Sequence, residues 1–311
     1  MDVMLTIIIV NWNGIDFLPN CLRSIVENPP SMSFEVIVVD NDSTDGSADW
    51  LRSQSTKSSF ESINLKLIES GANLGFGRAN NLAMKRTEGR VIFLLNPDTI
   101  VRKGAIDQLY FRLISSTKIG VTVPKLLHAD GTLQPSVWPS PTPLTILSET
   151  ILFRILPRRF YKGWLYGPHW DYSEERTVPI ICAAAMMLKR EVFDQVGGFD
   201  EDFHMYAEDL EYGMRISKMG WELRFTPNSE IHHLSGQSSA QRWTAVEKQV
   251  TIEKGYILFQ KKSLPTWLWP LNLCARIVVF SLYLLHNIAN RSEFDRYRKL
   301  IAANLKGFTS N

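Results

Sequence analysis

The sequence contains little cysteine. Only Cys21, Cys182 and Cys274 occur among its 311 residues, far apart and without a CxxC pair. This spacing excludes a zinc site built from cysteines. An odd number of scattered thiols fits a reducing compartment, so we expect the chain to act in the cytoplasm.

An excess of charge of one sign is also absent. The chain has 34 basic and 32 acidic residues, so no global basic field favours nucleic acid as a partner. The N-terminus runs directly into LTIIIVNWN without a basic leader or a cleavage site, and no secretory signal is predicted. By contrast, 45% of the residues are hydrophobic, which is enough for a substantial core in one large domain or two.

The stretch VIFLLNPDTI is the most informative one in the chain. Residues 91–95 are five consecutive apolar residues, which predict a strand buried on both faces. Pro97 ends that strand, so Asn96 and Asp98 should project together from its carboxyl end, where open α/β sheets bind ligands. Oxygen ligands there suit Mg²⁺ or Mn²⁺ carrying phosphate. The alternative is a plain proline turn after a strand.

The N-terminal segment predicts a βαβ unit. Residues 5–10 form a β-branched run that ends at Asn11, and residues 34–39 repeat the pattern. Between them, apolar residues recur at helical spacing over residues 16–27, before a Pro-Pro pair. Strand, helix and strand at this spacing predict an α/β fold with parallel strands.

Three aspartates follow the second strand. Asp45 and Asp42 are best interpreted as helix-capping and turn residues. Asp40 ends the strand itself, where a carboxylate can accept the N3 hydrogen of a uracil or thymine ring. We weigh that binding role of Asp40 about equally with a structural one.

A glycine-rich turn, residues 71–81, precedes a predicted helix. Its three glycines allow close backbone approach, and a helix N-terminus favours an anion such as phosphate. The turn matches neither a Walker sequence nor GxGxxG. Arg78 is a candidate partner for a diphosphate, although a solvated helix arginine is the commoner case.

Later segments give further predictions of secondary structure. Five prolines between Pro124 and Pro143 predict an irregular crossover without further sheet. The apolar run 177–189 predicts a buried strand, and residues 223–226 and 229–233 predict two short strands on either side of Pro227.

The segments IIIVNWNG, VIVVDNDSTDG, GANLGFGRANN and FLLNPD, in this order and spacing, resemble family 2 glycosyltransferases of the GT-A fold, especially their rhamnosyltransferase-like branch. The resemblance implies a mainly parallel, Rossmann-like mixed sheet flanked by helices. It also implies a nucleotide-sugar domain in which Asp40 reads the base. The donor-binding residues that it implies are Val10, Asn11, Asn13, Asp40, Asp42, Gly71, Asn73, Gly75, Gly77, Arg78, Asn81 and Asn96.

The resemblance also implies a metal site. The family holds its metal with an Asp-x-Asp-type motif, and this chain has Asn96-Pro97-Asp98 in its place. Asp98 is therefore the expected carboxylate ligand of Mg²⁺ or Mn²⁺. The later pattern HxxGxS, residues 233–238, resembles the family's late histidine, which selects His233 as a second ligand. A lone histidine is otherwise more often structural.

The acidic pair Glu208-Asp209 opens a predicted helix after a Gly-Gly-Phe-Asp turn. Two carboxylates at a helix N-terminus can simply stabilise the helix dipole. The resemblance instead makes Asp209 the general base for an acceptor hydroxyl, with Glu208 orienting the acceptor or the loop. Glu211 is an alternative base, but it lies two residues further on and should point to another side of the helix.

The chain after residue 240 is helical by pattern. Residues 264–285 carry only Arg276 as a full charge, and a central arginine costs about 2.5 to 3.5 kcal/mol in a membrane span. An interfacial helix is therefore preferred over a span, and a helix packed on the catalytic domain remains an equal alternative. We expect a glycosyltransferase domain over residues 1–240, with a nucleotide-sugar half (1–125) and an acceptor half (126–240), followed by a helical region (241–311).

Together these features predict an inverting, metal-dependent glycosyltransferase at the inner face of the cell membrane. The resemblance favours dTDP-rhamnose as the donor, then UDP sugars. The expected acceptor is a polysaccharide or a polyprenyl-diphosphate-linked glycan. A nucleotidyltransferase is the closest enzyme rival, and a non-catalytic nucleotide-sugar-binding protein is a rival of another class.

Overall fold

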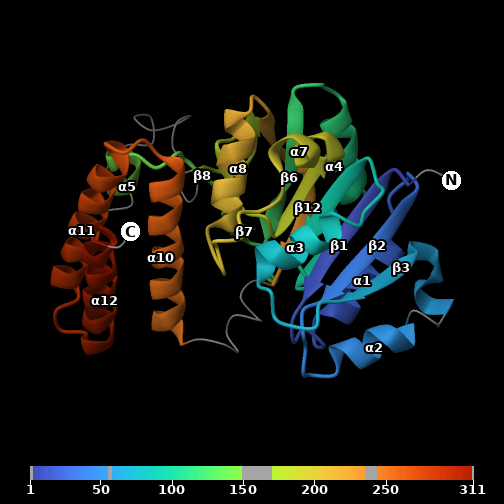
Figure 1. Cartoon of the computed structure of the whole chain (residues 1–311), viewed down its shortest axis with the longest axis horizontal. Coiled ribbons are helices and arrows are strands. Elements are labelled where there is room, and N and C mark those ends of the chain that lie inside the picture. Colours follow the sequence, from blue (N-terminus) through green and yellow to red (C-terminus); the bar gives the residue numbers. More distant parts are fainter. Residues whose placement is uncertain (1–2, 55–57, 149–169, 235–243, 310–311) are drawn as a thin grey trace.

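The computed structural model describes residues 3–54, 58–148, 170–234 and 244–309. Within these residues, one mixed sheet runs through the molecule, with helices on both faces (Figure 1). Its strands, in spatial order, are β3 (Leu65–Glu69), β2 (Phe34–Asp40), β1 (Leu5–Asn11), β4 (Val91–Leu95), β11 (Ala185–Lys189), β6 (Ile119–Leu127), β12 (Glu222–His233) and β5 (Thr99–Val101).

The first four strands in this order are parallel, and β12 is parallel to β6. β11 is antiparallel to both of its neighbours, β4 and β6. The carboxyl ends of β1, β2 and β4 therefore meet at one edge of the sheet, which is where the predicted ligand residues lie.

The predicted hydrophobic runs form the core. Ile7 and Ile9 of β1 pack on one face, against α1 (Leu18–Glu27) and α4 (Ala105–Ile114). Ile8 points to the other face, which is covered by α3 (Phe76–Met84), α7 (Arg190–Val196) and α8 (Glu208–Lys218). Both faces are buried, as continuous apolar strands require. The remaining N-terminal elements are α2 (Ser47–Gln54) and the 3-10 helix η1 (Ser58–Ile63). The predicted α/β class with a mainly parallel sheet is confirmed.

Three local predictions are corrected. The two strands expected around Pro227 are one strand, β12, because a bulge between Thr226 and Glu230 accommodates the proline. The proline-rich crossover contains β7 (Leu133–Gln134), β8 (Val137–Trp138) and α5 (Pro143–Leu147), because its prolines fall outside the short strands. The run 177–189 is divided among β9 (Arg176–Thr177), β10 (Ile180–Ile181) and β11, with a turn before β11.

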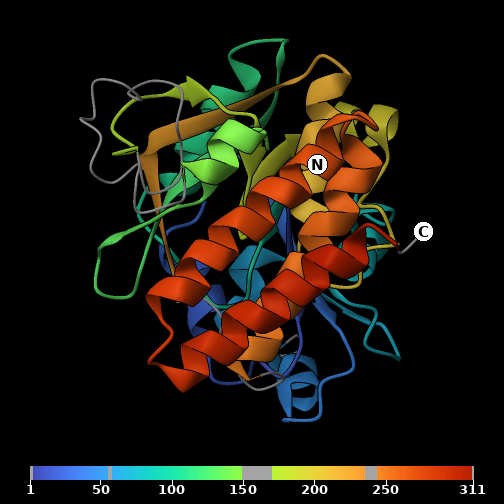
Figure 2. The same ribbon diagram turned by 90° about the vertical axis from the view of Figure 1, so that its left-hand side faces the viewer.

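The C-terminal region forms α10 (Ala245–Ser263), α11 (Leu268–His286) and α12 (Arg291–Gly307), which Figure 2 shows from the front. The predicted boundary at residue 240 lies outside the described residues. α10 packs against α8, where Lys218 Nζ donates to the carbonyl of Ser263 at 2.5 Å. α11 packs against α5 and α12, and Arg276 of α11 pairs with Glu253 of α10.

Candidate active site

The loops after β1 and β2 are joined by hydrogen bonds at the sheet edge. Asn11 Nδ2 donates to Asp40 Oδ1 at 3.2 Å, and the backbone N–H of Ser43 donates to Asp40 Oδ2 at 3.1 Å. Asn13 Oδ1 accepts from the backbone N–H of Thr44 at 2.7 Å. Asn13 and Asp42 both have positive φ, which their short polar side chains tolerate. Asp40 is thus held at the carboxyl end of β2 by two donors, and a carboxylate retains lone pairs for a third.

Two neighbouring residues complete this edge. Val10 precedes Asn11 at the end of β1 and is partly exposed. Asp45 Oδ1 accepts from the backbone N–H of Ser47 at 3.0 Å, so it acts as a cap at the start of α2.

The glycine turn is braced by Asn41, which the sequence reasoning did not select. Asn41 Oδ1 accepts from the backbone N–H of Leu74 at 2.9 Å, and Asn41 Nδ2 donates to Asn73 Oδ1 at 3.3 Å. Gly71 and Gly75 both have a φ in the left-handed region. The only sequence signal for Asn41 was its position directly after Asp40.

The space beside Gly75 and Gly77 is occupied by another segment of the protein itself. A Cβ on Gly75 would lie 2.5 Å from the carbonyl oxygen of His204, and one on Gly77 would lie 3.0 Å from Phe199 Cβ. The glycine turn therefore packs against the loop that precedes α8. Binding of phosphate by this turn stays a prediction.

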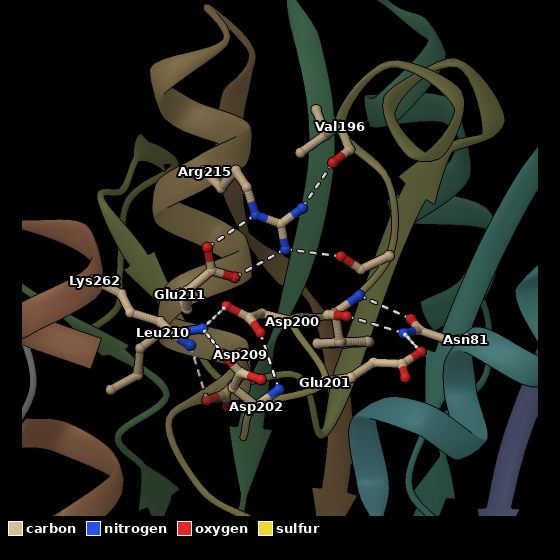
Figure 3. A network of polar contacts seen from close by, with 12 residues as sticks. Asn81, Val196, Asp200, Glu201, Asp202, Asp209, Leu210, Glu211, Arg215 and Lys262 are labelled. Carbon is tan, nitrogen blue, oxygen red and sulfur yellow. Dashed lines mark hydrogen bonds and ion pairs between the residues drawn. The ribbon is translucent and has the colours of Figure 1, made fainter. Parts of the chain in front are cut away.

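Arg78 and Asn81 reach the same loop. Asn81 Nδ2 donates to the carbonyl of Phe199 at 2.9 Å, and the backbone N–H of Phe199 donates to Asn81 Oδ1 at 2.8 Å. Arg78 donates to the carbonyl of Glu201 at 3.0 Å. Figure 3 shows Asn81 of α3 joined to this turn. Both side chains therefore connect α3 to the turn that follows α7, and their contact with a nucleotide stays a prediction.

Arg215 of α8 binds the end of α7 and the start of the turn that follows it. Its guanidinium donates to the carbonyls of Val196 and Gly198, each at 2.7 Å (Figure 3). It also forms a two-bond pair with the Glu211 carboxylate, with both distances 2.8 Å. Glu211, the alternative base, is therefore engaged in a structural ion pair.

The predicted metal ligands lie together. His233 Nε2 is 3.3 Å from Asp98 Oδ1 and 3.3 Å from Asn96 Nδ2, while His233 Nδ1 is 3.2 Å from Gln134 Oε1. With its proton on Nδ1, donated to Gln134 Oε1, His233 would present a lone pair at Nε2, which is the form in which an imidazole binds a metal. Gln134, which the sequence did not reveal, thereby orients the imidazole, as outer-shell partners of metal ligands do.

These residues fit a divalent cation. The Nε2 lone pair and the Asp98 carboxylate face the same space, and two ligands of Mg²⁺ in neighbouring octahedral positions stand about 3 Å apart. Within the described residues, no group of three or more His, Cys, Asp or Glu side chains is placed so that it could hold a metal ion. An ion here would take its remaining ligands from water and substrate phosphate, which is the usual arrangement for Mg²⁺. Gly236 and Ser238 of the HxxGxS pattern lie outside the described residues.

Asp209 is held by two backbone donors. Asp209 Oδ2 accepts from Ala183 N–H at 3.1 Å, and Oδ1 accepts from Leu210 N–H at 2.9 Å. Burial raises the pKa of Asp209 above its ordinary value, although these hydrogen bonds lower it. A carboxylate with a raised pKa is a stronger base, which suits proton abstraction. Burial, together with the charge of Asp209, also raises the pKa of Glu208 to about 8.

A short backbone path joins Asp209 to the metal-site residues. Asp209 binds the N–H of Ala183, and the carbonyl of the next residue, Ala184, accepts from the backbone N–H of Asn96 at 2.9 Å. The turn before β11 thus separates the acidic pair from the end of β4. The candidate base and the candidate cation ligands lie on the two sides of one turn.

The turn before Asp209 is strained. Tyr206 and Ala207 both have φ of +69°, a conformation that costs roughly 1 to 3 kcal/mol for residues other than glycine. α10 packs directly on it, because a Cβ on Gly255 would lie 2.5 Å from the carbonyl oxygen of Tyr206. The C-terminal helices therefore contribute to the geometry of the acidic pair.

A cavity of about 350 Å³ opens beside Asp209, between α5, α8, α10 and α11. Its lining residues include Trp138, Ile180, Asp209, Ile252 and Arg276. The volume is in the range of small-molecule sites.

Comparisons with known proteins identify the family and the fold. The model of "Glycosyl transferase family 2" matches residues 6–197, and that of "Glycosyl transferase family group 2" matches residues 160–303. The chain is 27% identical over 319 residues to the N-acetylglucosaminyl-diphospho-decaprenol L-rhamnosyltransferase of Mycobacterium tuberculosis, covering 96% of this chain and 97% of the relative. It is 30% identical over 220 residues to the low-salt glycan biosynthesis hexosyltransferase Agl10 of Haloferax volcanii, covering 69% and 62% of the two chains.

Among solved structures, the fold resembles the mannosyltransferase PcManGT from Pyrobaculum calidifontis in complex with GDP-Man and Mn²⁺. The TM-score is 0.62 at 17% identity, over 98% of this chain and 86% of that one. Fold and sequence together define a glycosyltransferase with the GT-A fold. The chain belongs to glycosyl transferase family 2, in its rhamnosyltransferase-like branch. The two rival classes, a nucleotidyltransferase and a non-catalytic binding protein, are set aside.

Proposed function

We propose that the protein transfers rhamnose from dTDP-rhamnose to a hydroxyl of a polyprenyl-diphosphate-linked glycan, with inversion at the anomeric carbon. The observation that carries the proposal is the position of Asp209. It lines the cavity, and only the turn before β11 lies between it and the site of Asp98 and His233. The relative from Mycobacterium tuberculosis, which matches nearly the whole chain, is named for a rhamnosyl transfer to such an acceptor.

In the proposed mechanism, Asp40 accepts the N3 hydrogen of the thymine ring, which places the donor along the carboxyl edge of the sheet. Asp98 and His233, with Asn96 beside them, would hold a divalent cation, and a cation bound there would supply positive charge to offset the charge of the leaving diphosphate. Asp209 takes the proton of the acceptor hydroxyl as its oxygen bonds to the anomeric carbon. The bond from that carbon to the phosphate oxygen breaks, and its electron pair leaves with the nucleotide diphosphate.

Membrane association is part of this proposal. One helix of the described chain, Leu268–His286, is long and apolar enough to cross a membrane, and 28% of its most apolar window is buried. A span would separate Arg276 from Glu253 and the buried Asn272 from the carbonyl of Pro141, to which it donates at 3.1 Å. We therefore place α11 in the plane of the membrane surface.

The outer side of α11 supports this placement. Its apolar residues Leu271, Val278, Leu282 and Leu285 are exposed. The following helix α12 contains five basic and two acidic residues, which favours anionic headgroups. A lipid-linked acceptor would then be presented close to the enzyme, at the inner face of the membrane.

The donor is tested by incubating purified protein with a panel of dTDP, UDP and GDP sugars, with and without Mn²⁺, and a polyprenyl-diphosphate-linked N-acetylglucosamine acceptor. We expect product only with metal, and most with dTDP-rhamnose. Consumption of another donor would correct the sugar. Metal-independent product would contradict the metal site, and failure of every donor would contradict the proposal.

A further inference from the structure

The cavity beside Asp209 has mainly apolar walls. Most of its lining residues are hydrocarbon or aromatic, and they come from β8 and the loop after it, α5, β10, α8 and α10: Trp138, Pro139, Pro141, Ile146, Ile180, Leu210, Ile252 and Tyr256. A free oligosaccharide in such a cavity would lose hydrogen bonds to water without replacing most of them, which costs free energy for each hydroxyl. A hydrocarbon chain would gain from the same walls.

Asp209 belongs to the same lining, so whatever enters the cavity lies next to the candidate base. In the proposed reaction, the only substrate that must reach Asp209 is the acceptor. The cavity is therefore on the acceptor side of the site, and its apolar walls select the apolar part of the acceptor.

The side of the cavity that contains Arg276 is held together by aromatic, ionic and hydrogen-bond contacts. Arg276 of α11 lines it, with its guanidinium 4.9 Å from the ring centre of Tyr256 and 4.8 Å from that of Phe280. Glu253 accepts from Arg276 Nε at 3.0 Å and from Asn304 Nδ2 at 2.9 Å. α10, α11 and α12 are thus joined behind the cavity, and α11 carries the exposed apolar residues Leu282 and Leu285 on another side.

We infer that this cavity binds the isoprene units nearest the diphosphate of the lipid-linked acceptor, while the acceptor sugar lies at Asp209. The inference rests on the proposed function, and it assigns α10 and α11 the role of a lipid-binding wall. An isoprenoid chain that leaves the cavity along α11 would enter the membrane directly, because we place α11 on the membrane surface.

The first test measures binding without catalysis. Farnesyl diphosphate, a water-soluble isoprenoid diphosphate, is titrated against the full-length protein in saturating dTDP and Mn²⁺, with tryptophan fluorescence as the signal. We expect saturable binding that inorganic diphosphate does not displace. Ile252→Glu should weaken it about tenfold or more, because a carboxylate in an apolar wall opposes burial of hydrocarbon. Ile114→Glu on α4 is the matched control, since Ile114 is 49% exposed and Ile252 is 38% exposed.

The second test compares sugar transfer to two acceptors. One is N-acetylglucosamine linked to polyprenyl diphosphate, and the other is the methyl glycoside of N-acetylglucosamine, which has no lipid. Ile252→Glu should lower kcat/KM for the lipid acceptor about tenfold more than for the methyl glycoside, whereas Ile114→Glu should leave this ratio unchanged. Equal losses on both acceptors, or unchanged farnesyl diphosphate binding in Ile252→Glu, would overturn the inference. Farnesyl diphosphate binding by a wild type that transfers no sugar would instead support the cavity and refute the proposed function.

Discussion

His233 Nε2 lies 3.3 Å from Asp98 Oδ1, although Asp98 is in the turn between β4 and β5 and His233 is the last residue of β12, far away in the sequence. Asn96 Nδ2 lies 3.3 Å from the same nitrogen, and Gln134 Oε1 lies 3.2 Å from the other one. Two groups with lone pairs are thus held facing one space at the carboxyl end of β4. This is the arrangement that an incoming cation with its diphosphate would stabilise.

Replacing either residue should weaken metal-dependent nucleotide binding. We expect Asp98→Ala and His233→Ala to lose roughly tenfold or more in affinity for dTDP in the presence of Mn²⁺, as measured by calorimetry. His232→Ala is the control, because His232 Nδ1 contacts the carbonyl of His128 at 3.0 Å instead. Wild-type affinity in Asp98→Ala, or equal losses in the two histidine variants, would contradict the proposed metal site.

The pH dependence of stability should reveal Glu208. Burial raises its pKa to about 8 in the folded protein, so the fold favours the protonated form. That stabilisation is complete below the ordinary glutamate pKa and is lost as the pH rises towards 8. Glu208→Gln cannot lose a proton, so its free energy of unfolding relative to wild type should rise between about pH 5 and pH 8, by on the order of a few kcal/mol.

Urea unfolding at several pH values measures this difference. Curves for wild type and Glu208→Gln that stay parallel across the range would show that Glu208 is not protonated in the fold.

Gly255 should be required for the geometry of the acidic pair. In Gly255→Ala, the new Cβ would meet the carbonyl oxygen of Tyr206, so α10 or the strained turn must shift. We expect kcat to fall by roughly tenfold to a hundredfold with donor affinity retained. Helix propensity alone would instead make the variant more stable, since alanine favours a helix by about 1 kcal/mol over glycine.

Steady-state kinetics with Lys254→Ala as the control check this, because Lys254 is an exposed residue of the same helix. Unchanged kcat in Gly255→Ala would mean that α10 does not position the base.

The outer side of α11 should bind membranes. Leu285 is 65% exposed, and Leu285→Glu should reduce cosedimentation with phosphatidylglycerol vesicles, while Ile114→Glu should not. Phosphatidylcholine vesicles should bind the wild type less, because the basic residues of α12 then lack anionic headgroups. High salt or alkaline buffer should release the protein, and resistance to both would indicate a span.

Much of the fold was predictable because its strands are apolar runs with abrupt polar ends. VIFLL before Asn96 and FEVIVV before Asp40 place both residues at the sheet edge without any tertiary information. His232 and His233 alternate along β12, so choosing between them required the family pattern. The structure places His233, not His232, beside Asp98.

The remaining features depend on contacts between distant segments. Nothing local to Asn81 shows that its amide is used by the backbone of Phe199, or that Asn41 braces the glycine turn. The apolar cavity exists only because α10 and α11 pack back against α5 and α8. A sequence pattern gives the elements but not such packing.

The most direct test of the central claim is transfer by Asp209→Asn. Donor binding uses the sheet edge and Asp98, whereas the base acts only when the acceptor hydroxyl loses its proton. We expect kcat to fall by roughly 10²- to 10⁴-fold with donor KM nearly unchanged, and the rise of kcat with pH to disappear. Near-wild-type transfer by Asp209→Asn, with Glu208→Gln inactive, would contradict the account by moving the base to Glu208.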